Sequence, residues 1–467
     1  MPGKTFDLLV VGGGPAGYVA AIRGAQLGMQ VACIEEEKLG GVCLNVGCIP
    51  TKALLSSALL VNQCQSAGSH GISFDNFSSD LGPAQKRSRD IAEKLSGGVS
   101  HLFKKNKIAH ITGSGRLLGG GAVEVTSADG TKETYTSDHI VVATGSRPRE
   151  IPVLPIDEKA IWSSTGALFQ KEAPASLAVV GAGAVGMEFA DIYNAYGSKV
   201  TVIESLERIL PVEDADSSAT LQRSFKKRGI AFHTGATVKK TVIGEGSVKL
   251  VFEGKDSNRH ELEVESVLCA VGRVPNTESL GLEEAGVEVD GQGFVIIDHH
   301  MRSSVRGVYA VGDCAGKQLL AHKAMHEGVV CVEAIAGEAH GSVDYANVPN
   351  CTYCNPEVAS VGLTEAQAKE QGFDIEVGKF PWIGNGRALA GGHTEGFVKV
   401  IRDKEYSEIL GAHIVGPHAT ELIAEFVVGR HLEATVEEMD RAMHPHPTLS
   451  EAVAEAALGA LGRTIHL

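Results

Sequence analysis

The apolar positions of the chain include two long stretches with one shared pattern. Residues 6–36, FDLLVVGGGPAGYVAAIRGAQLGMQVACIEE, and residues 176–205, SLAVVGAGAVGMEFADIYNAYGSKVTVIES, each run from a β-branched apolar strand through a glycine turn and an alanine-rich helix to a second strand. In both stretches an acidic residue, Glu35 or Glu204, follows 23 positions after the first glycine of the turn. Two strand–turn–helix–strand copies with this spacing predict two Rossmann-like dinucleotide-binding domains.

Outside these two stretches, the hydrophobic pattern predicts the elements in less detail. It predicts a helix over 41–65 interrupted at Pro50, an amphipathic helix over 85–106, and a long helical stretch over 419–433. Buried strands are expected in HIVVATGSRP, SVLCAVGRVPN and GVYAVGDCA. Past about residue 347, strands such as GFVKVIRD and EILGAHIVG precede the last helical stretch, which predicts a separate α+β domain.

The glycines of both turns leave room for a phosphate at the backbone. Gly12, Gly14 and Gly17 have no Cβ, so a pyrophosphate can lie against N–H groups at the positive end of the next helix, with Glu35 on the ribose hydroxyls. The second copy repeats these positions in Gly181, Gly183, Gly186 and Glu204. Because a carboxylate repels a 2′-phosphate, the second turn predicts a preference for NAD over NADP. Glycines that only let helix and strand pack closely are the alternative.

Length and charge narrow the class of protein. A chain of 467 residues fits about three domains, and a net charge of −15 argues against a general nucleic-acid binder. No uncharged apolar run approaches the roughly 18 residues of a membrane span. The N-terminal segment runs into a strand without a targeting pattern, which predicts a cytoplasmic protein, with a processed organellar form as the alternative. Nine scattered cysteines do not form a secreted disulfide scaffold, so a close pair favours catalysis.

Cys43 and Cys48 form such a pair in the segment GGVCLNVGCIPTK. Gly40 and Gly41 precede a predicted helix, and both thiols lie in its first two turns. Backbone N–H groups at this end of a helix stabilise a thiolate. Residues five apart on a regular helix point about 140° from one another, so a disulfide requires a local distortion that Pro50 can supply. Two buried small apolar residues are the alternative, and two close ligands alone argue against a metal site.

A second pair, Cys351 and Cys354 in NCTYCNPEVASVG, lacks the neighbouring glycines. Its Asn-Pro dipeptide reads as a turn into a strand, which favours two packed thiols over a redox or metal site.

Two dinucleotide sites and a thiol pair together predict an electron path. NAD exchanges a hydride, a disulfide takes electrons through thiolate chemistry, and a flavin can do both. We therefore expect a tightly held FAD between a diffusible NAD and the cysteine pair.

Several motifs resemble one family in their order. The thiol segment, ATGSRP, VGRVPN, AVGDCAG, LAHKAMHEG, NPEVASVGLTE and HPHPTLSE follow one another as in the FAD-dependent pyridine nucleotide-disulfide oxidoreductases, over nearly the whole chain. The resemblance is closest to the branch that oxidises protein-bound dihydrolipoamide with NAD. It implies a homodimer whose partners are lipoyl-bearing carrier proteins of 2-oxoacid dehydrogenase or glycine-cleavage complexes.

The resemblance also implies an α/β architecture of two Rossmann-like domains plus a C-terminal α+β dimerisation domain. The expected bounds are 1–150 for the FAD-binding domain, 151–275 for the NAD-binding domain, 276–346 for a central domain returning to the FAD site, and 347–467 for the interface domain.

The family's functional residues carry over by position. Cys43 resembles the interchange thiol that reacts with substrate, and Cys48 resembles the thiol beside the flavin. Lys52 resembles the lysine that reaches the isoalloxazine and Glu188 its partner, although two surface charges on alanine-rich helices would also explain that pair. Asp313 resembles the acidic residue on the ribityl or phosphate portion of FAD. The remaining cofactor positions are Thr144, Gly145, Ser146, Gly272 and Ala321.

An acid–base pair is expected near the C-terminus. Thr448 and Glu451 fit a capping box, so Glu451 has a structural explanation without any chemistry. His446 stands between two prolines ahead of Glu451, where a carboxylate can hold the imidazole tautomer and raise its basicity. The resemblance implies that His446 is the catalytic base and Glu451 its orienting partner, both supplied across the dimer interface, while His444 is structural.

Other activities stay open at this point. A glutathione-reductase-like enzyme usually needs basic residues around the second ribose, where this chain has Glu204, and a mercuric-reductase-like enzyme is expected to carry a C-terminal cysteine pair, whereas no Cys follows Cys354. A non-catalytic complex subunit that keeps the fold is the alternative from another class. No metal is expected.

Overall fold

The computed structural model describes residues 5–255, 257–338 and 340–466, and the chain divides into two compact units. The first unit contains the described residues up to Ala53 together with Pro83–Arg149 and Gly272–Val343. The second contains Leu54–Gly82, Glu150–Val271 and the described residues from Asp344 onward. The predicted α/β class is confirmed. The bounds of the four predicted domains stay predictions.

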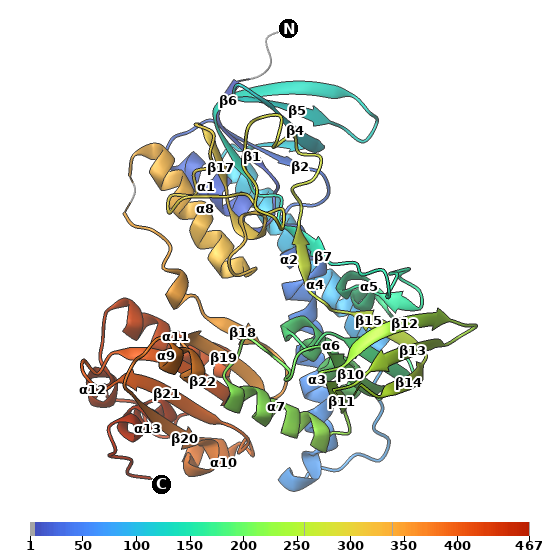
Figure 1. Cartoon of the computed structure of the whole chain (residues 1–467), viewed down its shortest axis with the longest axis vertical. Helices are drawn as coiled ribbons and strands as arrows, with labels where there is room; N and C mark the ends of the chain where they lie inside the picture. Colours follow the sequence, from blue (N-terminus) through green and yellow to red (C-terminus); the bar gives the residue numbers. More distant parts are fainter. Residues whose placement is uncertain (1–4, 256, 339, 467) are drawn as a thin grey trace. The chain divides into compact units, whose positions relative to one another are not determined.

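A seven-stranded sheet forms the centre of the first unit (Figure 1). Its parallel part has the order β3-β2-β1-β6 with β17 also paired to β6, and β5 and β4 extend β6 in antiparallel fashion. Four consecutive residues of β1, 8–11, are buried, as expected for a parallel strand covered on both faces. The strands of this unit are β1 Thr5–Val11, β2 Val31–Glu35, β3 Ala109–Thr112, β4 Ser114–Gly119, β5 Ala122–Thr126, β6 Lys132–Val142, β7 Ser146–Pro148, β16 Arg273–Pro275 and β17 Val308–Ala310.

Two helices of the first unit, α1 and α8, lie side by side (Figure 1). Arg23 on α1 and Glu333 on α8 form an ion pair at 2.7 Å. A Cβ on Gly328 of α8 would lie 2.7 Å from the Ala16 oxygen of α1, so the close approach depends on that glycine. The helices are α1 Pro15–Gln26, α2 Gly41–Val46, α3 Cys48–Gln65, which continues into the second unit, α4 Leu81–Lys105, η2 Gly312–Ala315 and α8 Ala321–Ala336.

The second unit holds three sheets. A parallel sheet has the order β11-β10-β9-β15-β8, which repeats the β3-β2-β1-β6-β17 arrangement of the first unit. An antiparallel sheet β12-β13-β14 follows it, and a five-stranded antiparallel sheet β18-β19-β22-β21-β20 belongs to the C-terminal region. The strands are β8 Ile161–Trp162, β9 Ser176–Val180, β10 Lys199–Glu204, β11 Ala231–Thr234, β12 Thr237–Ile243, β13 Val248–Glu253, β14 Arg259–Val264, β15 Ser266–Cys269, β18 Asn350–Thr352, β19 Glu357–Gly362, β20 Ile375–Pro381, β21 Phe397–Asp403 and β22 Ile409–Gly416.

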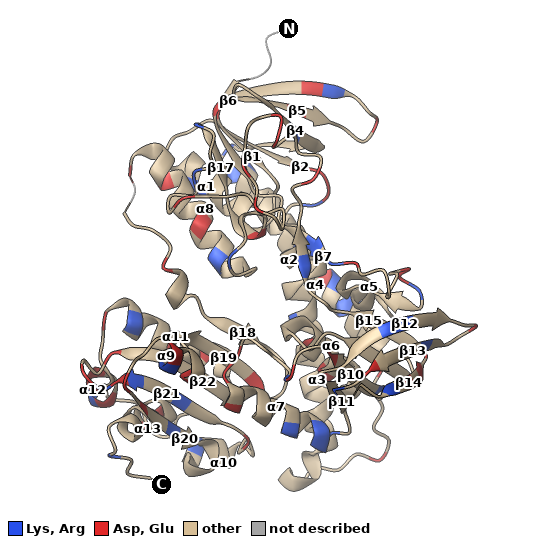
Figure 2. Cartoon of the chain, viewed as in Figure 1, with Lys and Arg blue, Asp and Glu red and all other residues tan. Residues whose placement is uncertain are grey.

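The helices of the second unit begin with η1 at the end of α3. They are η1 Ala67–His70, α5 Ser164–Phe169, α6 Ala184–Ala195, α7 Ala215–Lys227, η3 Tyr345–Asn347, α9 Glu365–Glu370, η4 Trp382–Gly384, α10 Gly386–Ala390, α11 Ala419–His431, α12 Val436–Arg441 and α13 Glu451–Ala460. Figure 2 shows acidic and basic residues distributed through both units.

One predicted helix is broken at a different residue. The stretch 41–65 was expected to be interrupted at Pro50, but α2 ends and α3 begins around Gly47, which has φ −144° and ψ −115°. A Cβ on Gly47 would lie 2.9 Å from the Val42 oxygen, so a side chain there would be crowded. Pro50 is the third residue of α3, where a backbone N–H would have no helical partner, and it is therefore tolerated.

The stretch Gly41–Gln65 also meets a test for membrane spans based on length and composition, and it is the one helix that does so in the described part of the chain. Core helices meet the same test, so this is weak evidence for a span.

Candidate active site

The first glycine turn is built by backbone constraints. Gly12 has φ +107°, and a Cβ there would lie 2.3 Å from the Ala143 oxygen. A Cβ on Gly17 would lie 1.9 Å from the Gly12 oxygen. Only glycine fits at either position, and Gly14 becomes the N-cap of α1 with its first-turn N–H groups unpaired by side chains. This is the arrangement that receives a phosphate at a helix N-terminus.

The second turn reproduces the first. Gly181 has φ +102°, and its Cβ would lie 2.3 Å from the Ala270 oxygen. The Cβ of Gly186 would lie 2.0 Å from the Gly181 oxygen. Gly183 caps α6 with φ −73° and ψ −177°, against −70° and −174° for Gly14. The internal repeat seen in the sequence is therefore a repeat of backbone geometry.

The two acidic residues of the repeat shape the turns themselves. One oxygen of Glu35 accepts a hydrogen bond from Gly13 N at 2.6 Å, and the other accepts from Glu37 N at 2.8 Å. One oxygen of Glu204 accepts from Ala182 N at 2.6 Å and the other from Leu206 N at 2.7 Å. Sequence reasoning assigned these carboxylates to ribose hydroxyls and did not foresee the loop contacts. The ribose contacts stay a prediction.

Thr144, Gly145 and Ser146 form a loop beside the end of β6. Thr144 Oγ1 donates to the Asn276 carbonyl at 2.6 Å, and Asn276 N donates to the Gly145 carbonyl at 3.0 Å. Gly145 has φ +71° and open space where a Cβ would stand. Gly272, at φ +113°, likewise has open space and accepts from Arg149 N at 3.0 Å. Both predicted positions thus leave room for a ligand close to the backbone, although Gly145 is half-buried and only Gly272 is exposed.

Asp313 belongs to the same cluster. Ser146 Oγ donates to Asp313 Oδ2 at 2.5 Å, and Arg273 Nε donates to Ser146 Oγ at 2.7 Å. Burial lowers the pKa of Arg273, whereas the charges of Asp313 and Cys48 raise it, which places the guanidinium within electrostatic reach of the thiol pair. Sequence reasoning did not assign Arg273, although it quoted its motif, VGRVPN.

A buried ion pair lies under the Asp313 turn and was also missed. Lys323 and Glu327, two residues of the helix that begins at Ala321, are fully buried and lie 3.1 Å apart. The i, i+4 spacing of Lys and Glu in LAHKAMHEG was a visible signal, but such a spacing is usually a surface pair.

The thiols of Cys43 and Cys48 are brought together by the break at Gly47. Both residues are free cysteines, half-buried, and joined by a side-chain hydrogen bond. That hydrogen bond raises the pKa of Cys43 strongly, burial and the charge of Cys48 raise it further, and Lys52 lowers it. The two thiols are therefore close enough to interact directly, and the thiolate expected at this helix terminus stays a prediction.

Tyr18 and Lys52 complete the surroundings of the thiols. Burial and the charges of both cysteines raise the pKa of Tyr18, so its hydroxyl stays neutral beside them. Lys52 acts on Cys43 from the first turns of α3. Its predicted partner Glu188 belongs to the second unit, where it is buried and accepts from Tyr353 N at 3.0 Å. The Lys52–Glu188 pairing stays a prediction.

His446 and Glu451 are in direct contact. His446 Nδ1 lies 2.8 Å from one oxygen of Glu451, and Thr448 N donates to the other at 2.8 Å. Partial burial would raise the pKa of Glu451, but these two hydrogen bonds outweigh it and lower the pKa. The predicted capping box is half right: Glu451 reaches back to Thr448, yet α13 begins at Glu451 with Ser450 as its N-cap. One carboxylate thus serves the helix start and the imidazole together.

His444 is held differently. Its Nε2 lies 2.6 Å from Glu425 and its Nδ1 lies 2.9 Å from the Ala442 carbonyl, so both ring nitrogens are engaged in structure. The His446 side chain is 80% exposed, which leaves its Nε2 accessible to a reactant.

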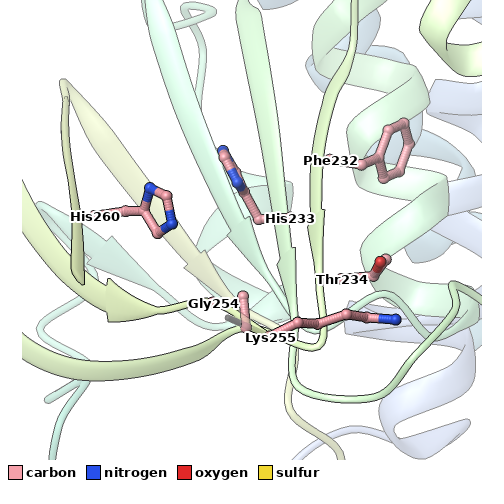
Figure 3. A pocket seen from close by; sticks show the side chains of 7 residues that line it. Phe232, His233, Thr234, Gly254, Lys255 and His260 are labelled. Carbon is pink, nitrogen blue, oxygen red and sulfur yellow. The ribbon is translucent and has the colours of Figure 1, made fainter. Parts of the chain in front are cut away.

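A cavity of about 390 Å³ lies beside the second turn (Figure 3). It is lined by Phe232, His233, Thr234, Ala236, Gly254, Lys255 and His260. Thr234 on β11 pairs in register with Glu204 on β10, so the cavity adjoins the predicted ribose position. Burial lowers the pKa of His233, and His260 lowers it further. The aromatic rings of this lining can stack on a planar ring.

For the second cysteine pair, the expected packing of two thiols stays a prediction, and the structure describes the surroundings of Cys354. Cys354 is fully buried and donates to the Pro356 carbonyl at 3.3 Å, and burial raises its pKa well above the usual value. Within 5–255, 257–338 and 340–466 no group of three or more His, Cys, Asp or Glu residues is placed to hold a metal ion.

Two dinucleotide turns, a close thiol pair and a separate histidine–carboxylate pair define a disulfide oxidoreductase that works with two nucleotides. The profile of the pyridine nucleotide-disulphide oxidoreductases matches residues 6–328, and that of their dimerisation domain matches residues 348–457. The chain belongs to this family, as its motifs predicted. The family membership makes it an oxidoreductase with FAD and NAD as cofactors and gives it a dimerisation domain.

Comparisons with individual proteins are more specific than the family profiles. The chain is 45% identical to a dihydrolipoyl dehydrogenase of Rhizobium etli, with 99% of each chain covered, and 42% identical to one of Bacillus subtilis at the same coverage. It is also 44% identical to a leghemoglobin reductase of Glycine max, covering 97% of this chain and 87% of that one. Among solved structures, LpdA from Mycobacterium tuberculosis superposes with a TM-score of 0.90 at 29% identity, covering 97% of this chain and 99% of the other.

Proposed function

We propose that the chain is a dihydrolipoyl dehydrogenase that oxidises protein-bound dihydrolipoamide to lipoamide and reduces NAD to NADH. The observation that carries the proposal is the hydrogen-bonded Cys43–Cys48 pair, set beside the first glycine turn in a chain that is 41–45% identical over its length to enzymes of that name. The predicted activity agrees with these relatives.

The Cys43–Cys48 pair and His446 have different roles in the oxidation of the substrate. His446 Nε2 takes a proton from one substrate thiol, because the Glu451 contact holds the proton of the neutral ring on Nδ1. The substrate thiolate then attacks Cys43 of a Cys43–Cys48 disulfide and releases Cys48 as a thiolate. The second substrate thiol attacks the mixed disulfide, so that cyclic lipoamide leaves and both enzyme cysteines are reduced.

The residues of the first unit fit FAD. Gly145 offers open backbone beside Ser146 and Asp313, and the Gly12–Gly17 turn presents a helix N-terminus to a pyrophosphate. Bound there, FAD supplies the exchange of two electrons between the reduced thiols and NAD. In the second unit, Gly183 and Glu204 are the proposed contacts for NAD, and open space surrounds the position of a Gly183 Cβ.

The proposed function also implies a dimer and a class of protein partners. We infer a homodimer in which His446 and Glu451 of one subunit serve the Cys43–Cys48 pair of the other, with lipoyl-bearing carrier proteins as substrates. A cytoplasmic location remains our prediction. Fractionation of cells and the molecular mass of the purified protein in solution test these two points.

The decisive experiment measures NADH formation from dihydrolipoamide by the purified protein and its Cys43→Ser variant. We expect a yellow parent protein that gains a long-wavelength absorbance band on reduction, and a variant whose kcat is lower by about a thousandfold or more. Cys64→Ser, near the end of α3, is the matched control and should keep full activity. A parent protein that reduces glutathione or mercuric ion but leaves dihydrolipoamide untouched would reject the proposed substrate.

A further inference from the structure

Lys323 and Glu327 form an ion pair that the proposed reaction does not use. Their side chains have zero exposure, and Lys323 Nζ lies 3.1 Å from Glu327 Oε2. Desolvating two charges is costly, and a buried pair is retained only where further hydrogen bonds satisfy both groups. The partners of this pair therefore indicate what it holds.

The hydrogen-bond partners of Lys323 and Glu327 lie at the two ends of the Gly312–Gly316 turn. Glu327 Oε2 accepts from Gly312 N at 2.7 Å, while Lys323 Nζ donates to the carbonyls of Gly312 at 3.2 Å and Gly316 at 3.0 Å. The three donors of the ammonium group are thus satisfied by Glu327 and by two carbonyls that flank η2. An apolar pair of equal volume would leave those carbonyls without a donor.

The two glycines of the turn do not fix its conformation by themselves. Gly312 and Gly316 both have positive φ, +79° and +76°, a region that glycine enters readily and leaves readily. A Cβ on Gly312 would lie 3.1 Å from the Ala16 Cβ, so the turn is pressed against α1, the helix of the first dinucleotide turn. The ion pair on α8 supplies the restraint that two glycines cannot.

Asp313 is the residue that this restraint positions. It follows Gly312 directly and accepts from Ser146 Oγ at 2.5 Å on the opposite side of the turn. We propose that Lys323 and Glu327 are positioning residues of the FAD site: they lock the Gly312–Gly316 turn so that the Asp313 carboxylate is presented to the cofactor in one orientation. This inference rests on the proposed function, because it takes the ligand of Asp313 to be FAD.

The test compares two ion pairs that involve the same helix. Glu327→Gln removes the charge from the buried pair, and Glu333→Gln removes it from the Arg23–Glu333 pair, which lies between α1 and α8 with side chains 32% and 14% exposed. Release of FAD from the purified holoenzyme is followed by the rise in free flavin fluorescence at a temperature well below unfolding. We expect Glu327→Gln to release FAD about tenfold faster or more, and Glu333→Gln to stay within about twofold of the parent.

A double variant separates positioning from general damage. Lys323→Met with Glu327→Gln leaves no uncompensated charge but gives the two carbonyls no donor. Its FAD release should lie between the parent and Glu327→Gln, at about threefold above the parent. If Glu327→Gln does not accumulate as folded protein, the double variant carries the test by itself, with unchanged far-ultraviolet circular dichroism as the check on folding.

Three results would overturn the inference. Glu327→Gln, or the double variant in its place, could release FAD at the parent's rate, or Glu333→Gln could release it as fast as Glu327→Gln. A parent protein that binds no FAD would reject the proposed function, and this inference with it. A parent that holds FAD and a Glu327→Gln variant that holds it equally well would reject the inference alone.

Discussion

The two glycine turns share an internal geometry but differ in what surrounds them. In the first, the Gly13 carbonyl accepts from Gly40 N at 2.8 Å, and in the second the Ala182 carbonyl accepts from Leu210 N at 2.8 Å. Each turn is therefore closed by the segment that follows its second strand. Gly40 sits at φ +96°, whereas Leu210 takes φ +43° with its side chain buried, an uncommon position for a leucine.

The difference lies in how tightly each turn is covered. A Cβ on Gly41 would lie 2.6 Å from the Gly14 Cα, so the segment carrying Cys43 rests directly on the first turn. The equivalent glycines differ less: a Cβ on Gly14 would have one neighbour, the Gly41 Cα at 3.8 Å, and nothing lies within 4 Å of a Cβ on Gly183 in the described structure. The thiol-bearing segment thus contacts the first turn, and the described residues provide no such contact at Gly183.

The largest expected effect comes from filling the first glycine of either turn. Gly12→Ala and Gly181→Ala each place a Cβ 2.3 Å from a carbonyl oxygen at positive φ, which should cost roughly 2–4 kcal/mol of unfolding free energy. Gly12→Ala should lose bound FAD, whereas Gly181→Ala should keep FAD and show a raised KM for NAD. Absorbance, urea unfolding and steady-state kinetics measure these outcomes.

Gly130→Ala is the control, since Gly130 has φ +82° with open space and tests the backbone strain alone. Loss of FAD from Gly181→Ala would contradict the assignment of the two turns.

A pH effect is expected next to the second turn. Glu213, whose N–H bonds the Leu210 carbonyl at 2.9 Å, is buried. Burial raises its pKa to about 7, with Asp214 adding to the increase and a hydrogen bond from Ser360 opposing it. Because the folded-state pKa exceeds the unfolded one, its stabilising contribution is complete at low pH and is lost as pH rises from about 4.5 toward about 7.

Urea unfolding at pH 5 and pH 8 should therefore show the parent losing up to roughly 3 kcal/mol more than Glu213→Gln over this interval. Glu35→Gln, beside the first turn, serves as a comparison for a carboxylate bonded to backbone N–H groups. Equal pH slopes for the parent and Glu213→Gln would show that the carboxyl does not titrate in this window.

A smaller effect concerns the choice of nucleotide. Glu204→Gln keeps an acceptor for Ala182 N but removes the charge that disfavours a 2′-phosphate. The ratio of kcat/KM for NAD to that for NADP should fall about tenfold, or about 1.4 kcal/mol. Glu35→Gln should leave this ratio unchanged, and an equal fall in both variants would mean that the change acts through loop stability.

The smallest effect is expected at Gly183. Alanine there meets no atom of the described protein, so the free energy of unfolding should change by less than about 0.5 kcal/mol. A raised KM for NAD with unchanged stability would then report a bound pyrophosphate near the backbone. If KM and stability are both unchanged, the nucleotide does not approach this glycine.

Much of the site could be predicted from local sequence. The two glycine turns follow from spacing because three glycines and a following acid specify one backbone path, and the Cys43–Cys48 and His446–Glu451 pairs lie within five residues of each other. The helix break was misplaced because Pro50 is an obvious breaker, whereas the effect of Gly47 depends on crowding by Val42. The loop contacts of Glu35 and Glu204 bridge 22 positions and leave no local signal.

The sequence by itself determined the repeat, the strand and helix types and the candidate chemistry, because side-chain periodicity and short motifs act over a few residues. The tertiary structure alone decided that Lys323 and Glu327 face the Asp313 turn rather than water, and that the segment carrying Cys43 packs on the first glycine turn. Those outcomes depend on which distant segments exclude solvent from a given side chain, and solvent exclusion is a property of the packed chain rather than of its local sequence.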